Sequence, residues 1–271
     1  MATPSRKILL ADDNEANRLI SRTILERSGH HVKMAENGSH VLSLANLTAY
    51  DLIVLDIVMP VIDGMRALRR LRRFKGPNQK TPVFALTTNC SAQDRQRYIL
   101  AGFDSVLSKP LRAGDIESAI KRYISGRPLP FSDPERSSAV KDTPLLDNDI
   151  ISQLTEMADA DRLDKIQSRF WTSIERQCEV IVTNLPETLR GTSSHLLEFR
   201  RAVHTIKGAS ANIGLAQLSK ICRQLQNTPP ANIPPLMAEM VDSLSMSRHA
   251  LNEALSRPGE LNSAMQMSGE H

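Results

Sequence analysis

Short apolar runs alternate with amphipathic segments over the first 125 residues. The clearest run, 52–55, has four consecutive branched apolar residues, which suits a strand buried on both faces of a parallel sheet. The run at 31–35 is weaker, with Val32 and Met34 on one face. The segments between the runs carry apolar residues at steps of three and four, the spacing of an amphipathic helix. The predicted strands are 7–11, 31–35, 52–56, 82–87 and 105–108. A helix follows each strand, and such alternation predicts a doubly wound α/β sheet with helices on both faces.

The last of these helices, 112–124, carries Ile116, Ile120 and Ile124 on one face, and we expect this face to be buried. Beyond residue 144 the pattern is helical throughout, with no convincing strand. We expect an all-α antiparallel helical bundle there, because each helix has a single apolar stripe and the joints are short.

The helix ends of the second half are predicted from capping residues and prolines. Asp147 is expected to cap a short helix, and Asp161 a long one that ends before Pro186. A third helix, 194–213, carries an apolar stripe and is stopped by Gly214. A fourth carries apolar residues from 215 to 225. The prolines at 229–230 and 234–235 are expected to break the chain before a fifth helix. Its expected buried residues are Met237, Met240, Val241, Leu244 and Leu251.

Composition and charge support two domains. The chain has 271 residues, of which 41% are apolar and 24% charged, as in ordinary globular proteins. Residues 1–125 carry a net charge of +7 and residues 126–271 a net charge of −3. Four prolines between 126 and 144 indicate a linker. The predicted boundaries are therefore a first domain at 1–125, a linker at 126–144, a helical domain at 145–256 and a loose tail at 257–271.

Two classes of protein are not favoured by the sequence. No apolar stretch approaches the roughly 20 residues that a membrane span needs. The three cysteines are odd in number and widely spaced, which indicates reduced intracellular thiols rather than a disulfide framework or a zinc site. We therefore expect a cytoplasmic location, which includes the cytosolic part of a membrane-bound protein.

Polar side chains follow four of the five predicted strands at the point where each strand ends. Asp12 and Asp13 follow the first strand, Asp56 ends the third, Thr87 ends the fourth and Lys109 follows the fifth. Because the carboxyl ends of parallel strands meet at one edge of the sheet, these side chains are expected to converge. Independent helix caps with a lysine counter-ion are the alternative interpretation, but such caps would not share one edge.

This set of side chains suits phosphoryl transfer. Three carboxylates close together need a cation, and Mg²⁺ binds through a few carboxylates together with phosphate oxygens and water. A lysine and a hydroxyl opposite the ion would hold the oxygens of a transferring phosphoryl group. The carboxylate of Asp56 can act as the nucleophile and form an acyl phosphate.

Residues 6–125 resemble the receiver domain of two-component response regulators and hybrid kinases. The matching pieces are LLADDNEANR, DLIVLDIVMPVIDG, PVFALTTN and SKPL. The resemblance implies a flavodoxin-like sheet with strand order 2-1-3-4-5, and it makes Asp56 the phospho-acceptor. It also implies that Asp12, Asp13, Asp56 and the backbone carbonyl of Val58 hold Mg²⁺, while Thr87 and Lys109 bind the phosphoryl group. Val106 stands where many receivers carry a switch aromatic, so signalling through that aromatic is not expected.

A second candidate site lies on the helix at 194–213. His204 follows the buried Val203 and is expected near the solvent, with Lys207 and Gly208 one turn later and Arg200 one turn earlier. An exposed imidazole beside Lys207 and Arg200 suits a charged phosphoryl adduct. Glycine within a helix costs about 1 kcal/mol, which makes sense where another surface approaches closely. The alternative is a surface histidine beside a chance glycine.

The segment AVHTIKGASANIG resembles the active helix of histidine phosphotransfer (Hpt) domains, and the similarity extends over roughly 145–256. The resemblance implies that His204 carries the phosphoryl group, that Lys207 stabilises it and that Gly208 leaves room for a docked receiver. The order of receiver, linker and Hpt domain resembles the C-terminal part of hybrid sensor histidine kinases of the RpfC type.

We therefore expect a phosphorelay protein with Mg²⁺ as its cofactor. Its expected partners are a histidine kinase that donates phosphate and a downstream response-regulator receiver. Nucleic acid is not expected. The chain shows no Gly-rich nucleotide-binding stretch, so we do not expect it to phosphorylate itself from ATP.

Two other interpretations stay open. In the first, the helical half binds a partner or nucleic acid and His204 is incidental. In the second, the receiver is degenerate and serves only as a docking domain.

Overall fold

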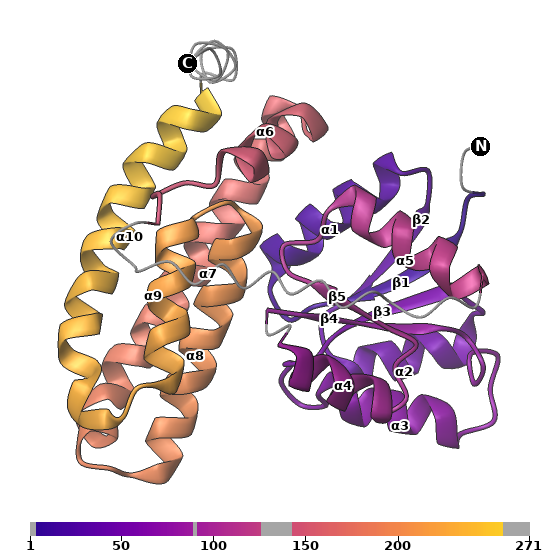
Figure 1. The fold of residues 1–271 in the computed structure, drawn as a ribbon, viewed down its shortest axis with the longest axis horizontal. Coiled ribbons are helices and arrows are strands. Elements are labelled where there is room, and N and C mark those ends of the chain that lie inside the picture. Colours follow the sequence, from indigo (N-terminus) through magenta and orange to yellow (C-terminus); the bar gives the residue numbers. More distant parts are fainter. Residues whose placement is uncertain (1–3, 89–90, 126–142, 257–271) are drawn as a thin grey trace. The chain divides into compact units, whose positions relative to one another are not determined.

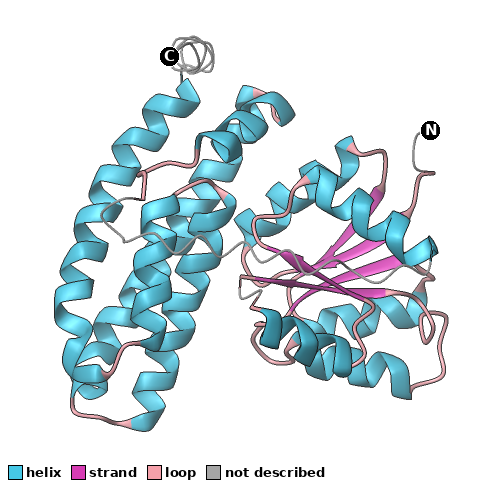
Figure 2. Ribbon diagram, viewed as in Figure 1, coloured by secondary structure: helices cyan, strands magenta, loops and turns pink. Residues whose placement is uncertain are grey.

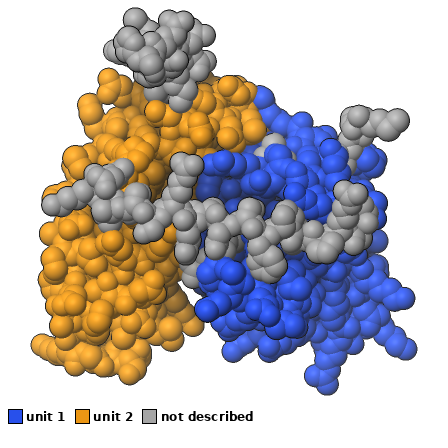
Figure 3. Space-filling model, in the orientation of Figure 1, with its two compact units in different colours: residues 1–136 blue, residues 137–271 orange. Residues whose placement is uncertain are grey.

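The computed structural model describes residues 4–88, 91–125 and 143–256. The chain forms two compact units, 1–136 and 137–271, which are described separately below (Figure 3). Most of the predicted linker, 126–142, and the whole predicted tail, 257–271, lie outside the described residues.

Unit 1 has the predicted α/β fold, with strands and helices in strict alternation (Figures 1 and 2). The five strands are parallel in the order β2-β1-β3-β4-β5, which confirms the expected topology. The strands are β1 (Lys7–Ala11), β2 (His31–Ala35), β3 (Leu52–Asp56), β4 (Val83–Thr87) and β5 (Ser105–Ser108). The helices are α1 (Glu15–Arg27), α2 (Gly38–Leu47), α3 (Gly64–Arg73), α4 (Ala92–Leu100) and α5 (Ala113–Ser125).

The sheet has a hydrophobic core on each face, because successive strand residues point to opposite sides. Ile53 and Leu55 belong to the core cluster that includes residues of α2 and α3. Val54 and Phe84 belong to the other cluster, which includes residues of α1 and α5. Burial on both faces explains why β3 and β4 read as unbroken apolar runs.

The prediction that Ile124 lies on the buried face of α5 is wrong. Ile116 and Ile120 are buried, but the side chain of Ile124 is 62% exposed. Each step of four residues turns about 40° further around a helix, so Ile124 lies about 80° away from Ile116. Tyr123, in the same last turn, is the residue that faces the sheet, and its ring centroid lies 6.0 Å from that of Phe84 in β4.

Unit 2 is helical over its described residues, as expected. Its elements are α6 (Asn148–Met157), α7 (Ala160–Leu189), α8 (Ser193–Asn212), α9 (Ala216–Asn227), the 3-10 helix η2 (Pro230–Asn232) and α10 (Ile233–Ser256). Helix α8 packs against both α7 and α9, and α9 also packs against α10. Asp147 caps α6 as predicted, since its side chain accepts a hydrogen bond from the backbone N–H of Ile150.

Both predicted ends of α7 are wrong. The cap is Asp159, which accepts a hydrogen bond from the backbone N–H of Arg162, whereas Asp161 lies in the first turn. The helix also continues through Pro186 to Leu189. Proline removes the bond that would reach the carbonyl of Val182, but Val182 is 68% exposed and water can reach that side of the helix. Near a helix end the loss of one backbone hydrogen bond destabilises the helix little.

Two expectations for α10 are also wrong. Pro234 and Pro235 lie in its first turn rather than before it, where backbone N–H groups have no helical partner in any case. Val241 is 58% exposed, whereas Ser243 and Ser247 are buried. The buried face of α10 therefore includes small polar residues, which an apolar pattern does not reveal.

Candidate functional site

Strand register brings the predicted receiver residues to one edge of the sheet. Ala11 is paired with Leu55, so Asp12 is level with Asp56 on the neighbouring strand. On the other side of β3, Asp56 is paired with Leu86, and Thr87 is the next residue. Thr87 is in turn paired with Ser108, which precedes Lys109. Along the strand direction, all the predicted strand-end residues therefore lie within about one residue of one another.

Lys109 joins the carboxylates of this edge. Its Nζ lies 2.5 Å from Oδ2 of Asp12 and 2.6 Å from Oδ2 of Asp56. All three side chains are almost fully buried, with exposed fractions of 4% or less. The peptide bond between Lys109 and Pro110 is cis. The ammonium group is thus held against two carboxylates away from solvent.

The chain after β1 fixes Asp12 from the other side. Its Oδ1 accepts hydrogen bonds from the backbone N–H of Asn14 and from Nδ2 of Asn17. The guanidinium of Arg18 donates to the backbone carbonyls of Asp12 and Asp13. Because Asn14 also caps α1, the first turn of this helix positions the acidic pair.

Burial raises the pKa of two of the three carboxyl groups. Desolvation is the main cause that raises the pKa of Asp56 from 3.8 to about 7, while Lys109 acts in the opposite direction. Desolvation, followed by the charge of Asp12, raises the pKa of Asp13 to about 6. Burial alone would lower the pKa of Lys109, but Asp12 and Asp56 outweigh it and the pKa is raised. A single lysine therefore does not neutralise the cluster.

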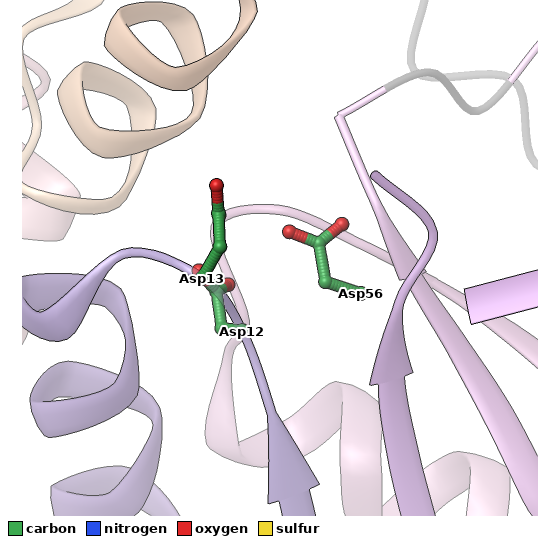
Figure 4. A group of neighbouring side chains, drawn as sticks. All are labelled: Asp12, Asp13 and Asp56. Atoms are coloured by element: carbon green, nitrogen blue, oxygen red, sulfur yellow. The ribbon is translucent and has the colours of Figure 1, made fainter. Parts of the chain in front are cut away.

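The three carboxylates fit a hard metal ion. Asp12, Asp13 and Asp56 each offer one oxygen, and these oxygens lie within 4.8 Å of one another (Figure 4). Octahedral Mg²⁺ with bonds of about 2.1 Å places its ligands about 3 to 4 Å apart, so a small rotation or one bridging water closes the difference. A second cation would also relieve the excess negative charge. The residue set and its spacing are thus those of an acidic Mg²⁺ site.

The other predicted receiver residues lie around this cluster. Thr87 is buried at the end of β4, and its carbonyl accepts a hydrogen bond from the backbone N–H of Lys109. The backbone N–H of Val58 donates to Oδ1 of Asp56 over 3.2 Å, which places the start of the β3–α3 loop beside that carboxylate. Val106, at the position of the absent switch aromatic, is buried in β5.

The second site lies in unit 2 and contains a residue that the sequence did not reveal. His204 is half-buried on α8, and its Nδ1 lies 2.8 Å from the side-chain amide of Gln226 on α9. The two residues are 22 positions apart, so only the packing of α8 against α9 brings them together. A glutamine one position after the buried Leu225 gives no local signal of such a role.

The expected exposed face around His204 is only partly present. Arg200 is exposed, as predicted. Lys207, however, is only 1% exposed, and Gly208 is buried as well. Helix α8 packs against both α7 and α9, so these two helices cover side chains on more than one face of α8 near its C-terminal end. Lys207 is therefore not a solvent-exposed neighbour of the imidazole.

Both halves of the chain match known domain families. Residues 8–121 match the response regulator receiver domain, and residues 160–257 match the Hpt domain. The chain is 29% identical over 227 residues to the aerobic respiration control sensor protein ArcB of Escherichia coli, covering 84% of this chain and 28% of ArcB. It is 26% identical over 219 residues to the sensory/regulatory protein RpfC of Xanthomonas campestris, covering 79% of this chain and 29% of RpfC.

Among solved structures, the receiver domain of the sensor histidine kinase PA1611 from Pseudomonas aeruginosa is similar to unit 1. It is 30% identical, with a TM-score of 0.41, and the match covers 45% of this chain and 99% of that domain. That structure has a magnesium ion coordinated in its active-site cleft.

The chain thus consists of a receiver domain followed by an Hpt domain, and this combination serves phosphorelay signal transduction. It resembles the C-terminal parts of the hybrid sensor kinases ArcB and RpfC, and spans less than a third of the length of either. Within residues 4–88, 91–125 and 143–256, no helix is both long and apolar enough to cross a bilayer.

Proposed function

We propose that Asp56 accepts a phosphoryl group and that His204 carries it in the same relay. The observation that carries this proposal is the contact of Lys109 with Asp56 inside a group of three carboxylates, two of which are buried. A structural ion pair would need one carboxylate for one ammonium group. Three carboxylates around one lysine leave negative charge that a metal ion and a phosphoryl group would use.

The first step is an in-line displacement at phosphorus. A carboxylate oxygen of Asp56 attacks the phosphoryl group of a phosphohistidine, the P–N bond breaks, and its electron pair returns to the imidazole of the donor. Lys109, which contacts Asp56, would neutralise charge on the phosphoryl oxygens, and Thr87, at the same edge of the sheet, would bind one of them. The ionised form of Asp56 is the nucleophile, so the step needs a deprotonated carboxyl group.

Asp12, Asp13, Asp56 and the carbonyl of Val58 would hold Mg²⁺. When bound, the ion would supply positive charge to the carboxylates and the phosphoryl oxygens.

In the second step the imidazole of His204 is the nucleophile. The Gln226 amide contacts Nδ1, so attack falls to Nε2. Nε2 has a lone pair only when the ring proton is on Nδ1, and the amide oxygen of Gln226 accepts a hydrogen bond from that N–H once the amide is turned by 180°. The new P–N bond forms as the P–O bond to an aspartate breaks, and the carboxylate leaves. The Nδ1 proton stays on the ring.

The proposed partners are a histidine kinase as phosphate donor and a receiver domain downstream of His204, and the proposed location is the cytoplasm. The exposed Arg200 is a candidate contact for the phosphoryl group or the docked receiver. Lys207 and Gly208 would act from beneath the imidazole, because both are buried.

Site-specific loading of the full chain tests the proposal. The chain is incubated with acetyl phosphate and MgCl₂, and phosphate is located by intact mass and by its stability to acid and alkali. We expect an alkali-labile acyl phosphate in His204→Gln and no phosphate in Asp56→Asn. We expect an acid-labile phosphohistidine only in the parent chain. A phosphohistidine that also forms in His204→Gln, or unaltered partner output in that variant, contradicts the role of His204.

A further inference from the structure

Helix α3 carries its apolar and its basic residues on opposite faces. The residues that it buries in the core of unit 1 are Gly64, Ala67, Leu68 and Leu71. The exposed face carries four arginines, Arg66, Arg69, Arg70 and Arg73. Each set has the spacing i, i+3, i+4 and i+7 and so forms one stripe, and the two stripes lie about 160° apart around the helix. The four arginines are called the basic stripe below.

The basic stripe is not a salt-bridged helix surface. Residues 64–80 contain seven Lys and Arg residues and no Asp or Glu. Among the residues that the structure describes, only Arg66 of the stripe has an ion-pair partner, Asp63 at 3.5 Å. The helix dipole favours basic residues in the last turn, which leaves Arg66 and Arg69 unexplained. Because like charges three and four residues apart destabilise a helix, the stripe is unfavourable until negative charge covers it.

Two large apolar side chains are exposed beside the basic stripe. Phe74, directly after α3, is 62% exposed, and Leu47, at the end of α2, is 82% exposed. Helices α2 and α3 lie side by side (Figure 1). Nδ2 of Asn78 donates to the carbonyls of Ala45 and Thr48, which joins the chain after α3 to the end of α2. The two apolar side chains therefore belong to the same end of this helix pair.

A cavity of about 500 Å³ lies between α2 and α3. Arg70 and Phe74 line it from one side, and Leu42 and Asn46 of α2 line it from the other. Helix α2 contributes no acidic residue. The guanidinium of Arg70 and the amide of Asn46 can both donate to phosphate oxygens. The cavity thus has the size and the donors for a group that carries a phosphate.

This end of the helix pair is remote from Asp56. Helix α3 begins near that carboxylate, where the backbone N–H of Gly64 donates to the carbonyl of Ile57. The helix then runs for about 15 Å against the direction of the parallel strands. A partner that covers Arg73 and Phe74 therefore leaves the Asp56 edge of the sheet open.

We propose that the basic stripe, Leu47 and Phe74 together bind the surface of an anionic phospholipid membrane. Basic residues beside exposed Phe and Leu are typical of surfaces that lie at the boundary between lipid headgroups and acyl chains. Anionic headgroups supply the charge that the stripe lacks, and the boundary layer buries the two apolar side chains. Nucleic acid would match the charge, but its phosphate backbone gives Leu47 no role. The inference goes beyond the proposed function and does not depend on it.

Co-sedimentation of the full chain with lipid vesicles tests the inference. One preparation contains phosphatidylcholine alone, and the other contains about one third phosphatidylglycerol. We expect binding to the second preparation only, and weaker binding at high salt. Arg69→Gln, Arg70→Gln and Arg73→Gln together should weaken binding about 100-fold, because each basic residue near such a surface contributes about fivefold. Phe74→Ser keeps the charge and should weaken binding about fivefold, since most of the Phe74 surface is still available for burial.

A second triple variant with the same loss of charge is the matched control. It combines Lys33→Gln, Arg97→Gln and Arg176→Gln, which are exposed and lie outside α2 and α3, and it should bind like the parent. Equal weakening by both triple variants, equal binding to both preparations, or full affinity of Phe74→Ser overturns the inference. Tighter binding of a short DNA duplex or of polyglutamate at the same ionic strength would overturn it in favour of nucleic acid or an acidic protein. Loading of Asp56 by acetyl phosphate should be equal in all variants, and this assay detects a failure of the proposed function separately.

Discussion

Removing the charge of Asp56 should stabilise the receiver, although this residue is the proposed phospho-acceptor. The folded-state pKa of about 7 exceeds the ordinary value of 3.8, so folding favours the protonated form. The contribution of Asp56 to stability is therefore complete below pH 3.8 and is lost as pH rises through about 7. Asparagine is uncharged at every pH and avoids this loss.

The size of the effect follows from the same values. The difference between 3.8 and about 7 corresponds to about 4 kcal/mol at a pH above both. The hydrogen bond from Lys109 already lowers this pKa, so its loss is included in the difference. We expect Asp56→Asn to raise the free energy of unfolding by about 4 kcal/mol near pH 8 without metal, and by less than half of this near pH 5. Millimolar Mg²⁺ should reduce the gain by neutralising the carboxylates of the parent.

Urea unfolding followed by tyrosine fluorescence measures this effect in the full chain. All three tyrosines belong to unit 1 and the single tryptophan, Trp171, belongs to unit 2, so the two units have separate signals. The tryptophan transition should not change and is the internal control. A destabilising Asp56→Asn near pH 8, or a difference from the parent that does not vary with pH, would refute the assignment of buried, destabilising charge to this site.

Three further predictions concern the amide, the loop and the metal. Gln226→Ala should slow phosphate arrival on His204 at least tenfold, with helix content by circular dichroism unchanged, because the ring loses the group that orients it. Gly64→Ala should lower the urea midpoint of the tyrosine signal, since a Cβ would lie 2.3 Å from the carbonyl oxygen of Asp56; Gly114→Ala, with open space at that position, is the control and should not lower it. The apparent affinity for Mg²⁺, measured by calorimetry, should rise between about pH 5.5 and pH 7.5 with release of protons, because the ion displaces protons from Asp56. Affinity independent of pH would exclude Asp56 as a ligand.

The receiver site could be predicted because it depends on strand order and little else. The strands that carry the site, β1, β3, β4 and β5, are short and mostly buried, and a charged or hydroxylated residue ends or follows each of them. Parallel strands with right-handed crossovers place those ends together, so position in the sequence becomes position in space. A local rule was sufficient for the helix cap Asp147, because a cap bonds to a backbone N–H two or three positions away.

The features of the second site that the sequence did not predict depend on contacts between residues that are far apart in the sequence. Gln226 meets His204 only through the packing of α9 on α8, and no periodic pattern encodes that contact. Helical spacing predicts that Lys207 shares the exposed face of His204, but α8 has neighbours on two sides and the residue is covered.

We propose that Asp56 and His204 carry the same phosphoryl group one after the other. A ³¹P NMR time course of the full chain with acetyl phosphate and MgCl₂ tests this claim most directly. We predict that an acyl phosphate signal appears first and that a phosphohistidine signal grows from it, with both absent in Asp56→Asn. A phosphohistidine signal that grows at the same rate in Asp56→Asn, or an acyl phosphate that never gives rise to one, contradicts the claim.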